Sequence, residues 1–214
     1  MADLHRLYDA VLNGDQKTAV AVTKEALDEG CDPMELITKS MVPAMDEVGR
    51  RFECEEYFVP ELLLSARAMK GALELLRPLL AASGAQPAGR VVIGTVKGDL
   101  HDIGKNLVAS MLEGGGFEVI DLGADVAPER FVEAVQEKRA SIVALSALLT
   151  VTMPSMRRTI EAFEKAGLRE SVKVMVGGAP VTPQFARDIG ADGYGENATA
   201  AVALARQFVQ AARQ

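Results

Sequence analysis

The sequence has little of what several functional classes need. Its 214 residues include no tryptophan, only two cysteines and two histidines, and 5% aromatic residues. Cys31 and Cys54 stand apart, without the CxxC spacing of a zinc site or the pattern of a disulfide framework, so both thiols are expected to be structural. The amino terminus lacks a basic segment followed by an apolar core, and no stretch approaches the roughly 20 apolar residues that span a bilayer. We therefore expect a cytoplasmic protein without a membrane partner.

A surplus of positive charge is also missing. The chain has 23 Lys and Arg against 30 Asp and Glu, a formal net charge of −7, and no dense basic run. Because nucleic-acid binding depends largely on Lys and Arg that neutralise phosphates, direct recognition of nucleic acid is disfavoured. A hydrophobic fraction of 49% with 25% charged residues is typical of a globular protein, and the length suffices for two small cores.

The two halves of the chain differ in hydrophobic periodicity. In the first half, apolar residues recur at helical spacing and predict four helices. These helices cover residues 4–12, 18–27, 33–48 and 60–80. Residues 83–90 are small and polar and include proline and glycine, which is the composition of a linker. We predict a helical domain over residues 1–82, in the form of a four-helix bundle, and a second domain over residues 91–214.

The second half alternates apolar, β-type runs with amphipathic segments. The predicted strands are residues 91–96, 117–122, 142–145, 172–176 and, more weakly, 191–194. Five β-α units imply an α/β fold with a parallel, doubly wound sheet of the flavodoxin or Rossmann type. Since such sheets host receivers, flavin carriers and nucleotide binders, the function has to be inferred from the site.

The most informative segment follows the first predicted strand and places His101 on a strand-to-helix loop. Ligands bind at such loops in open α/β sheets, because the carboxyl ends of the strands face a crevice. Asp99, two residues before His101, can accept the second ring N–H of the imidazole, which fixes the tautomer and makes the other nitrogen a better metal ligand. Gly104 would let a large ligand approach the backbone closely.

The pattern Asp-x-His-x-x-Gly, formed by Asp99, His101 and Gly104, resembles the cobalamin-binding motif of corrinoid proteins, in which the histidine is the lower ligand of cobalt. Two further elements of that family match, at the ends of the third and fourth predicted strands. Ser-x-Leu is present at residues 146–148 and Gly-Gly at residues 177–178. The resemblance implies that three segments converge on one cobalamin. The implied cofactor contacts in them are Gly98, Asp99, Leu100, His101, Asp102, Ile103, Gly104, Ser146, Leu148, Gly177 and Gly178.

The segment after the third predicted strand carries three hydroxyl side chains. In the family, two of them face the buried base of the cofactor's nucleotide tail, and these roles fall on Ser146 and Thr150. The third binds the aspartate of the His–Asp pair and falls on Thr152, where the methionine-synthase branch has serine. Asp99, His101 and Thr152 are thus the implied catalytic set. Gly177 and Gly178 are expected to leave room for the ligand against the backbone, and Tyr194 to contact the tail.

The helical half resembles the cap module of cobalamin-dependent methyltransferases, including methionine synthase, over residues 41–70. In that family apolar side chains of the module shield the upper face of the corrin. The alignment implies cofactor contacts at Phe52 and Val59, with Met45 one or two helical turns back. Because the module must move before a partner can reach cobalt, the linker at residues 83–89 is the predicted hinge.

These resemblances imply a corrinoid methyl carrier. Methylcobalamin would cycle between Co(I) and methyl-Co(III), and proton movement through Asp99 and Thr152 would accompany the loss of the His101 ligand. No substrate barrel is present, so no activity is expected without partners. The implied partners are a donor-specific methyltransferase, an acceptor methyltransferase that uses a folate or a thiol coenzyme, and a reductive activase. The sequence does not name the methyl donor.

Other functions fit the sequence less well. A cobalamin-sensing regulator would need a DNA-binding helix-turn-helix, and the amino half has no basic recognition helix. A small subunit of an adenosylcobalamin mutase would share the three motifs but would lack the helical module. A dinucleotide-binding protein would show G-x-G-x-x-G after the first strand. A phosphoaccepting receiver would have aspartate in place of Ser146. We therefore favour the carrier.

Overall fold

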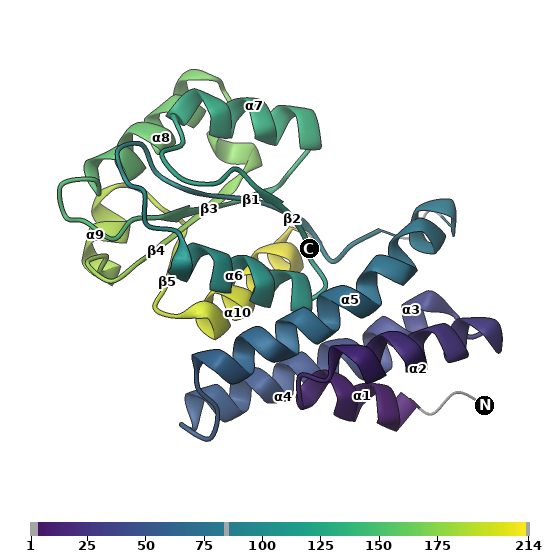
Figure 1. Cartoon of the computed structure of the whole chain (residues 1–214). Helices are drawn as coiled ribbons and strands as arrows, with labels where there is room; N and C mark the ends of the chain where they lie inside the picture. The colour runs from purple at the N-terminus through teal and green to yellow at the C-terminus, as the bar shows by residue number, and fades with distance from the viewer. Residues whose placement is uncertain (1–3, 84–85, 213–214) are drawn as a thin grey trace. The chain divides into compact units, whose positions relative to one another are not determined.

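The structure is a computed structural model, and it describes residues 4–83 and 86–212 (Figure 1). The chain divides into two compact units. The first comprises Met1–Pro87 with the short segment Glu113–Gly116, and the second comprises Ala88–Leu112 and Phe117–Gln214. Within the predicted linker, residues 84–85 lie outside the described residues, so the hinge stays a prediction.

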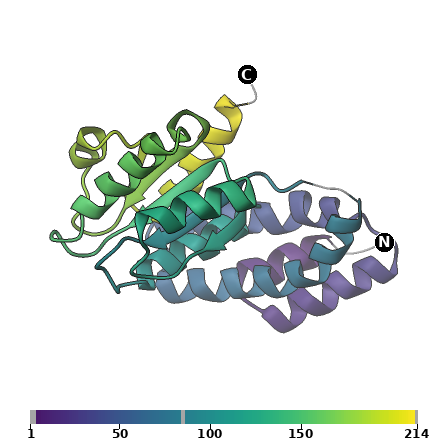
Figure 2. The ribbon, with the colours of Figure 1, turned by 90° about the horizontal axis from the view of Figure 1, so that it is seen from above.

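The first unit is a bundle of helices (Figure 1, Figure 2). Its elements are α1 (Leu4–Leu12), α2 (Gln16–Asp28), α3 (Pro33–Leu36), the π-helical turn η1 (Ile37–Met41), α4 (Val42–Glu53) and α5 (Val59–Ser83). The long helix α5 packs against α2 and α4, and α1 packs against the same two helices. Asp15 begins α2 because its side chain accepts the N–H of Thr18. Within the part of this unit that the structure describes, four helical segments are therefore present, as predicted.

The third predicted helix, residues 33–48, is correctly placed but is not regular. The turn Ile37–Met41 is π-helical, and the N–H of Val42 donates to the carbonyl of Ile37. Pro43, in the first turn of α4, has no N–H to donate to the carbonyl four residues earlier. The backbone accommodates this loss by widening for one turn, which joins α3, η1 and α4 into one continuous segment.

The second unit is built on a five-stranded sheet in which every pairing is parallel. Its strands are β1 (Arg90–Thr95), β2 (Glu118–Asp121), β3 (Ile142–Ser146), β4 (Lys173–Gly177) and β5 (Gly193–Gly195), in the order β2-β1-β3-β4-β5. The intervening helices are α6 (Ile103–Gly114), α7 (Pro128–Lys138), α8 (Pro154–Lys165), the 3-10 turn η2 (Arg169–Ser171), α9 (Pro183–Asp188) and α10 (Ala198–Ala211). The predicted α/β sheet is confirmed, including its weak fifth strand.

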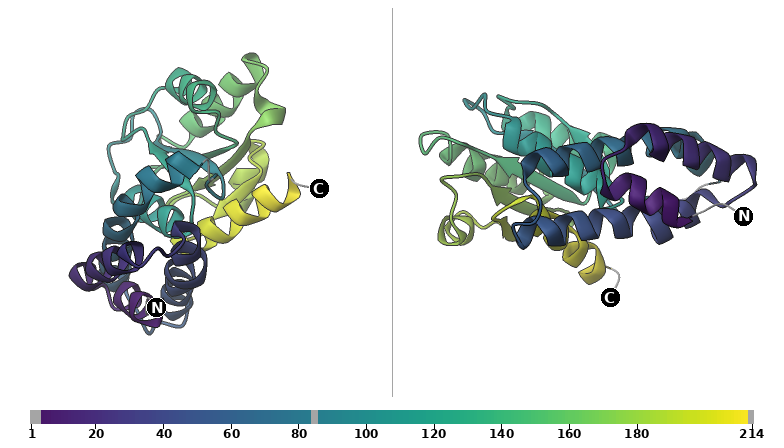
Figure 3. Two further views of the ribbon diagram at one scale, coloured as in Figure 1. Left: turned by 90° about the vertical axis from the view of Figure 1, so that its right-hand side faces the viewer. Right: turned by 60° about the horizontal axis from the view of Figure 1, so that its bottom comes forward.

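Helices cover both faces of this sheet. α7, α8 and α9 share one buried cluster with the strands, and Phe131 and Phe163 are its largest side chains. α6 and α10 lie on the opposite face (Figure 1, Figure 3). β1, β3 and β4 are largely buried and read as continuous apolar runs, which is why their positions could be predicted. Among the described residues, no helix is long and apolar enough to cross a membrane.

Candidate functional site

Four strand ends lie side by side at the carboxyl edge of the sheet. Thr95 of β1 pairs with Ser146 of β3, which pairs with Gly177 of β4, and Gly177 pairs with Gly195 of β5. The three segments singled out by the sequence begin at or just after this row. The strand order changes direction between β1 and β3, and ligands bind at that point in doubly wound sheets. The fold therefore brings the three motifs to one ligand-binding position.

His101 lies on the loop between β1 and α6, and its imidazole is held by Asp99. His101 Nδ1 is 2.8 Å from Asp99 Oδ1, and the backbone N–H of His101 donates to the same oxygen over 3.1 Å. The hydroxyl of Thr95 donates to the carbonyl of His101 over 3.0 Å. An ionised carboxylate accepts the proton of Nδ1, so the lone pair is left on Nε2. Half of the His101 side chain is exposed, which leaves the ring accessible to a metal.

Asp99 is completely buried and uses both carboxylate oxygens. Its Oδ2 accepts hydrogen bonds from the N–H groups of Leu148 and Leu149, over 2.8 and 3.2 Å, and from the Thr152 hydroxyl over 2.6 Å. Burial by itself raises the pKa of Asp99. The hydrogen bonds from Thr152, His101 and Leu148 outweigh burial and hold the pKa well below its usual value. Asp99 is therefore a carboxylate at neutral pH.

The Thr152 hydroxyl has two acceptors within reach. Its oxygen is 2.6 Å from Asp99 Oδ2 and 2.8 Å from the carbonyl oxygen of Leu149, and the side chain is buried. A hydroxyl has one proton, so it donates to only one of these oxygens at a time. Protonation of Asp99 would turn the Thr152 proton toward Leu149 without moving a heavy atom. Threonine thus supplies the hydroxyl contact for which the methionine-synthase branch has serine.

Large apolar side chains are exposed on the loops that follow β1 and β3 and at the start of α6. Ile103 is 82% exposed, Val151 80% and Leu100 75%, and Leu148 and Leu149 are also exposed. A Cβ added to Gly104 would meet nothing within 4 Å. Apolar groups exposed together commonly mark a binding surface. The imidazole of His101 therefore lies among apolar groups with open space beside the start of α6.

Gly177 and Gly178 are needed by the sheet itself. A Cβ on Gly178 would lie 2.0 Å from the carbonyl oxygen of Ala147, and the φ of Gly178 is +125°. A Cβ on Gly177 would lie 2.7 Å from the carbonyl oxygen of Gly195. The expectation that the missing Cβ atoms leave room for a ligand is wrong, because neighbouring backbone fills that room. Contact between these glycines and the cofactor stays a prediction.

The remaining predicted residues of the α/β unit are less closely tied to His101. Ser146 is half-buried at the end of β3, and its carbonyl accepts the N–H of Val96. Thr150 is exposed on the following loop. The carbonyl of Asp102 accepts the N–H of Asn106, at the start of α6. Tyr194 packs partly buried against the core of the sheet. Their roles toward a cofactor stay predictions.

Three residues of the helical unit were expected to face the cofactor. Met45 is only 2% exposed and lies among the buried residues of α4, with Ala44 and Val48, and its contact with the cofactor stays a prediction. Phe52 is half-buried near the end of α4, and Val59 is 41% exposed at the start of α5. Phe58, Leu63 and Leu64 are exposed close to Val59 in the sequence. The turn from α4 to α5 and the start of α5 therefore carry several exposed apolar side chains.

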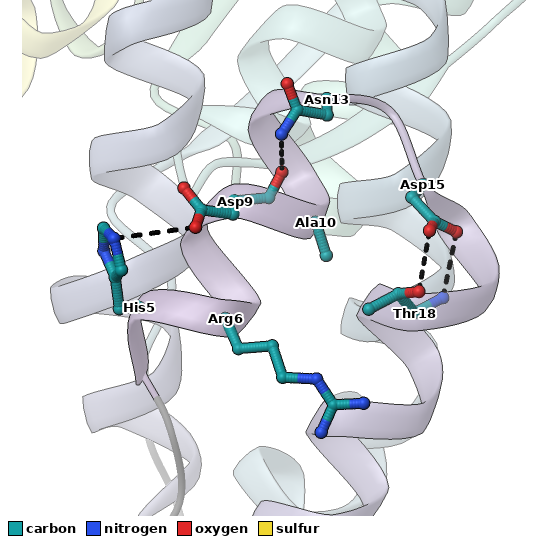
Figure 4. Close-up of a pocket in the computed structure, with 7 residues that line it drawn as sticks. All are labelled: His5, Arg6, Asp9, Ala10, Asn13, Asp15 and Thr18. Carbon is teal, nitrogen blue, oxygen red and sulfur yellow. Dashed lines mark hydrogen bonds and ion pairs between the residues drawn. The ribbon is translucent and has the colours of Figure 1, made fainter.

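The helical unit also has a hollow of about 390 Å³ at α1 and the start of α2 (Figure 4). Its polar groups are paired within the protein. Asp15 accepts both the N–H and the hydroxyl of Thr18, Arg6 bonds to Glu25, and His5 lies 3.6 Å from Asp9. These contacts cap and join helices, and none of the predicted site residues lines the hollow.

Sequence patterns missed several groups that hold the site together. Leu148 and Leu149 act on Asp99 through backbone N–H groups, which leave no mark in the sequence. Lys105 is buried, and its ammonium lies 2.6 and 2.5 Å from the two carboxylate oxygens of Asp121 at the end of β2. This ion pair fixes the first turn of α6 to the sheet. The position of Lys105 directly after Gly104 of the motif was the signal that the sequence offered for this ion pair.

Comparison with known proteins identifies the family. Residues 89–203 match one B12 binding domain family, and residues 3–77 match a second family with the same description. The chain belongs to the cobalamin-binding corrinoid proteins. The predicted cofactor, cobalamin, is thereby confirmed.

Three relatives show how similar this corrinoid protein is to known ones. Trimethylamine corrinoid protein 1 of Methanosarcina acetivorans is 46% identical over 200 residues, which is 92% of this chain and 93% of the relative. Dimethylamine corrinoid protein 1 of the same organism is 44% identical over 207 residues, 96% and 97% of the two chains. A chain in the crystal structure of the methanol:cobalamin methyltransferase complex of Methanosarcina barkeri matches 97% of this chain, and 79% of its own length, with a TM-score of 0.85 and 30% identity.

The site of the corrinoid protein fits this cofactor. The corrin ring itself supplies four nitrogen ligands to cobalt, so the protein needs to provide only one. Among the described residues, no group of three or more His, Cys, Asp or Glu could hold a metal ion without such a ring. A single oriented imidazole, flanked by exposed Leu100 and Ile103, suits a metal carried in a large ring.

Proposed function

We propose that this corrinoid protein is a methyl carrier in which His101 is the lower ligand of cobalt. Corrinoid proteins are components of methyltransferase systems, and the chain of the methanol:cobalamin methyltransferase complex that matches this one supports the same role here. Bound cobalamin supplies a cobalt centre that takes a methyl group from one substrate and gives it to another. The observation that carries the proposal is the 2.8 Å contact between Asp99 and Nδ1 of an exposed imidazole at the switch point.

The protein's own residues control the imidazole and its proton. Asp99 orients the ring, keeps the proton on Nδ1 and increases the basicity of Nε2. With the imidazole uncoordinated, a proton would be held at the His101–Asp99 pair, and the Thr152 hydroxyl would turn to the Leu149 carbonyl to accommodate it. Leu100, Ile103 and Val151 exclude water from the region around the ring once a ligand covers them.

We further propose that a methyltransferase specific for a methylated amine supplies the methyl group. Two relatives of nearly equal identity are named for trimethylamine and dimethylamine, which favours this donor class over others. A second methyltransferase would pass the methyl group to a folate or a thiol coenzyme, and a reductive activase would restore the reduced cofactor. No donor site is needed on this chain for such a scheme.

Methyl transfer to the reconstituted protein tests the proposed function. The cobalamin-loaded protein is reduced and mixed with trimethylamine or dimethylamine, with and without a methyltransferase specific for each amine. Formation of methylcobalamin, followed by absorbance, is expected only when one of these methyltransferases and its own amine are both present. Methylation by an amine without any methyltransferase would contradict the carrier role, and no methylation with any combination would contradict the amine donor class.

A further inference from the structure

The loop that carries His101 is held from outside by residues of other segments. The hydroxyl of Ser155, buried on α8, donates to the carbonyl of Lys97 over 3.0 Å. On the other side of the loop, the connection from β2 to α7 runs beside the end of β1. Val126 forms a parallel bridge with Val96, and the N–H of Thr95 donates to the carbonyl of Gly123 over 2.9 Å. The β2–α7 connection therefore continues the sheet next to the His101 loop.

Asp125, in this connection, binds the His101 loop in three ways. Its Oδ1 accepts the N–H of Gly98 over 2.8 Å, and its Oδ2 pairs with the Lys97 ammonium over 3.0 Å. Its own N–H donates to the carbonyl of Asp99 over 2.9 Å. Asp125 thus binds the N–H of Gly98 and the carbonyl of Asp99, which are consecutive residues shortly before His101.

The backbone of Asp125 is specialised for this contact. Its φ is +54°, in the left-handed region, where aspartate is tolerated better than most residues with a Cβ. Gly98, whose N–H it accepts, has a φ of +88°. Neither conformation follows from regular secondary structure. A non-glycine residue is kept at positive φ where surrounding contacts hold it, and such positions cluster at functional sites.

The contact bears on the cobalt ligand through Asp99. The Asp99 carboxylate reaches the imidazole on one side and the N–H groups of Leu148 and Leu149 on the other, so its backbone position must be set closely. Asp125 fixes the carbonyl of Asp99, and with it the peptide plane that leads into Leu100 and His101. The N–H of Gly98 and the ammonium of Lys97 lower the pKa of Asp125, so it is a carboxylate at neutral pH.

We propose that Asp125 is a positioning residue for the cobalt ligand, which sets how much of the bound cofactor has His101 coordinated. This inference rests on the proposed role of His101. Asp125 does not touch the imidazole in the described contacts; it acts through the backbone of Gly98 and Asp99. Its removal is expected to leave corrinoid bound while the imidazole is released from cobalt more easily.

Three variants, reconstituted with methylcobalamin, separate the two side-chain contacts of Asp125, and each keeps the backbone N–H that donates to the Asp99 carbonyl. Asp125→Gly keeps the positive φ and removes the acceptor. Asp125→Asn keeps an acceptor oxygen for Gly98 and is the conservative rescue. Lys97→Met is the matched control, because it removes the exposed ion pair and leaves the Gly98 contact. The ratio of nitrogen-ligated to unligated cofactor is read from the visible spectrum at pH 7, and corrinoid affinity is measured separately.

The ratio is expected to fall about tenfold in Asp125→Gly, with corrinoid affinity changed less, and to stay within about twofold of wild type in Asp125→Asn and Lys97→Met. An unchanged ratio in Asp125→Gly would overturn the assignment of Asp125 alone. A wild-type spectrum without a lower nitrogen ligand would overturn the role of His101 and this inference with it.

Should Asp125→Gly not fold, amide hydrogen exchange of the wild-type protein keeps the inference testable. The Gly98 N–H, on an exposed residue, is expected to exchange at least tenfold more slowly than in an unstructured peptide. Exchange at the unprotected rate would contradict the contact.

Discussion

At the scale of residues, the buried carboxylate of Asp99 does most to define the site. It accepts five hydrogen bonds, from the backbone and ring of His101, the N–H groups of Leu148 and Leu149, and the Thr152 hydroxyl. A buried charge without a formal counter-ion is stabilised here by convergent donors, which is why its pKa is lowered despite burial. One side chain thus links the folding of two loops to the orientation of the metal ligand.

Replacing Asp99 by asparagine is expected to destabilise the protein. The amide nitrogen would face either the His101 donors or the three donors on the other side, so at least one buried donor would lose its acceptor. The free energy of unfolding should fall by about 2–4 kcal/mol, as measured by urea unfolding at pH 7. Asp102→Asn, on the same loop, is the control and should change it by no more than about 0.5 kcal/mol. Equal values for the two variants would contradict the role given to Asp99.

The same substitution has a signature in pH. Because the pKa of Asp99 is lower in the folded than in the unfolded state, its ionisation stabilises the fold fully above the unfolded-state pKa of about 4. That contribution is lost as pH falls toward the folded-state pKa. The difference in unfolding free energy between wild type and Asp99→Asn should therefore be constant from pH 7 to pH 5 and shrink below about pH 4. A difference that stays constant down to pH 3 would show that Asp99 is not held ionised by the fold.

At the scale of elements, strands and helices could be predicted, and the contacts between loops could not. Continuous apolar runs marked the buried strands, and β5 differs from its prediction only in where it begins and ends. The π-helical turn before Pro43 is a local backbone adjustment that hydrophobic periodicity does not record. The candidate site shows the same division. His101, Asp99 and Thr152 were predicted from the resemblance to the corrinoid motifs, whereas the Leu148 and Leu149 donors and Asp125 depend on which loops the sheet order makes neighbours.

Gly178 and Gly104 allow a paired test, because the space for a Cβ is filled by neighbouring backbone at Gly178 and is open at Gly104. Gly178→Ala places a Cβ against the Ala147 carbonyl and requires an unfavourable φ, so it should destabilise the protein by about 3 kcal/mol or more. Gly104→Ala places its Cβ in open space, so unfolding free energy should change by less than about 1 kcal/mol. Gly104→Ala should instead weaken corrinoid binding. The two variants are compared by urea unfolding and by corrinoid titration, and a reversed order of effects would contradict these assignments.

At the scale of the whole molecule, the chain combines two units that both match B12 binding families. The α/β unit carries the histidine loop, and the helical unit exposes apolar side chains at its α4–α5 turn. The resemblance to cobalamin-dependent methyltransferases predicted a movable helical module, and the linker hinge follows from that resemblance. A histidine loop on one unit and exposed apolar side chains on the other fit the proposed carrier, which would present its cofactor to partner enzymes in turn.

The first measurement to make is the ultraviolet–visible spectrum of the methylcobalamin-loaded protein beside His101→Ala. His5→Ala is the matched control, because His5 is the other histidine and is largely exposed on α1. Wild type and His5→Ala should show a nitrogen-ligated lower face, and His101→Ala should bind corrinoid with that ligand missing. The same nitrogen-ligated spectrum in His101→Ala, or no corrinoid bound by the wild type, would contradict the assignment of His101 as the cobalt ligand.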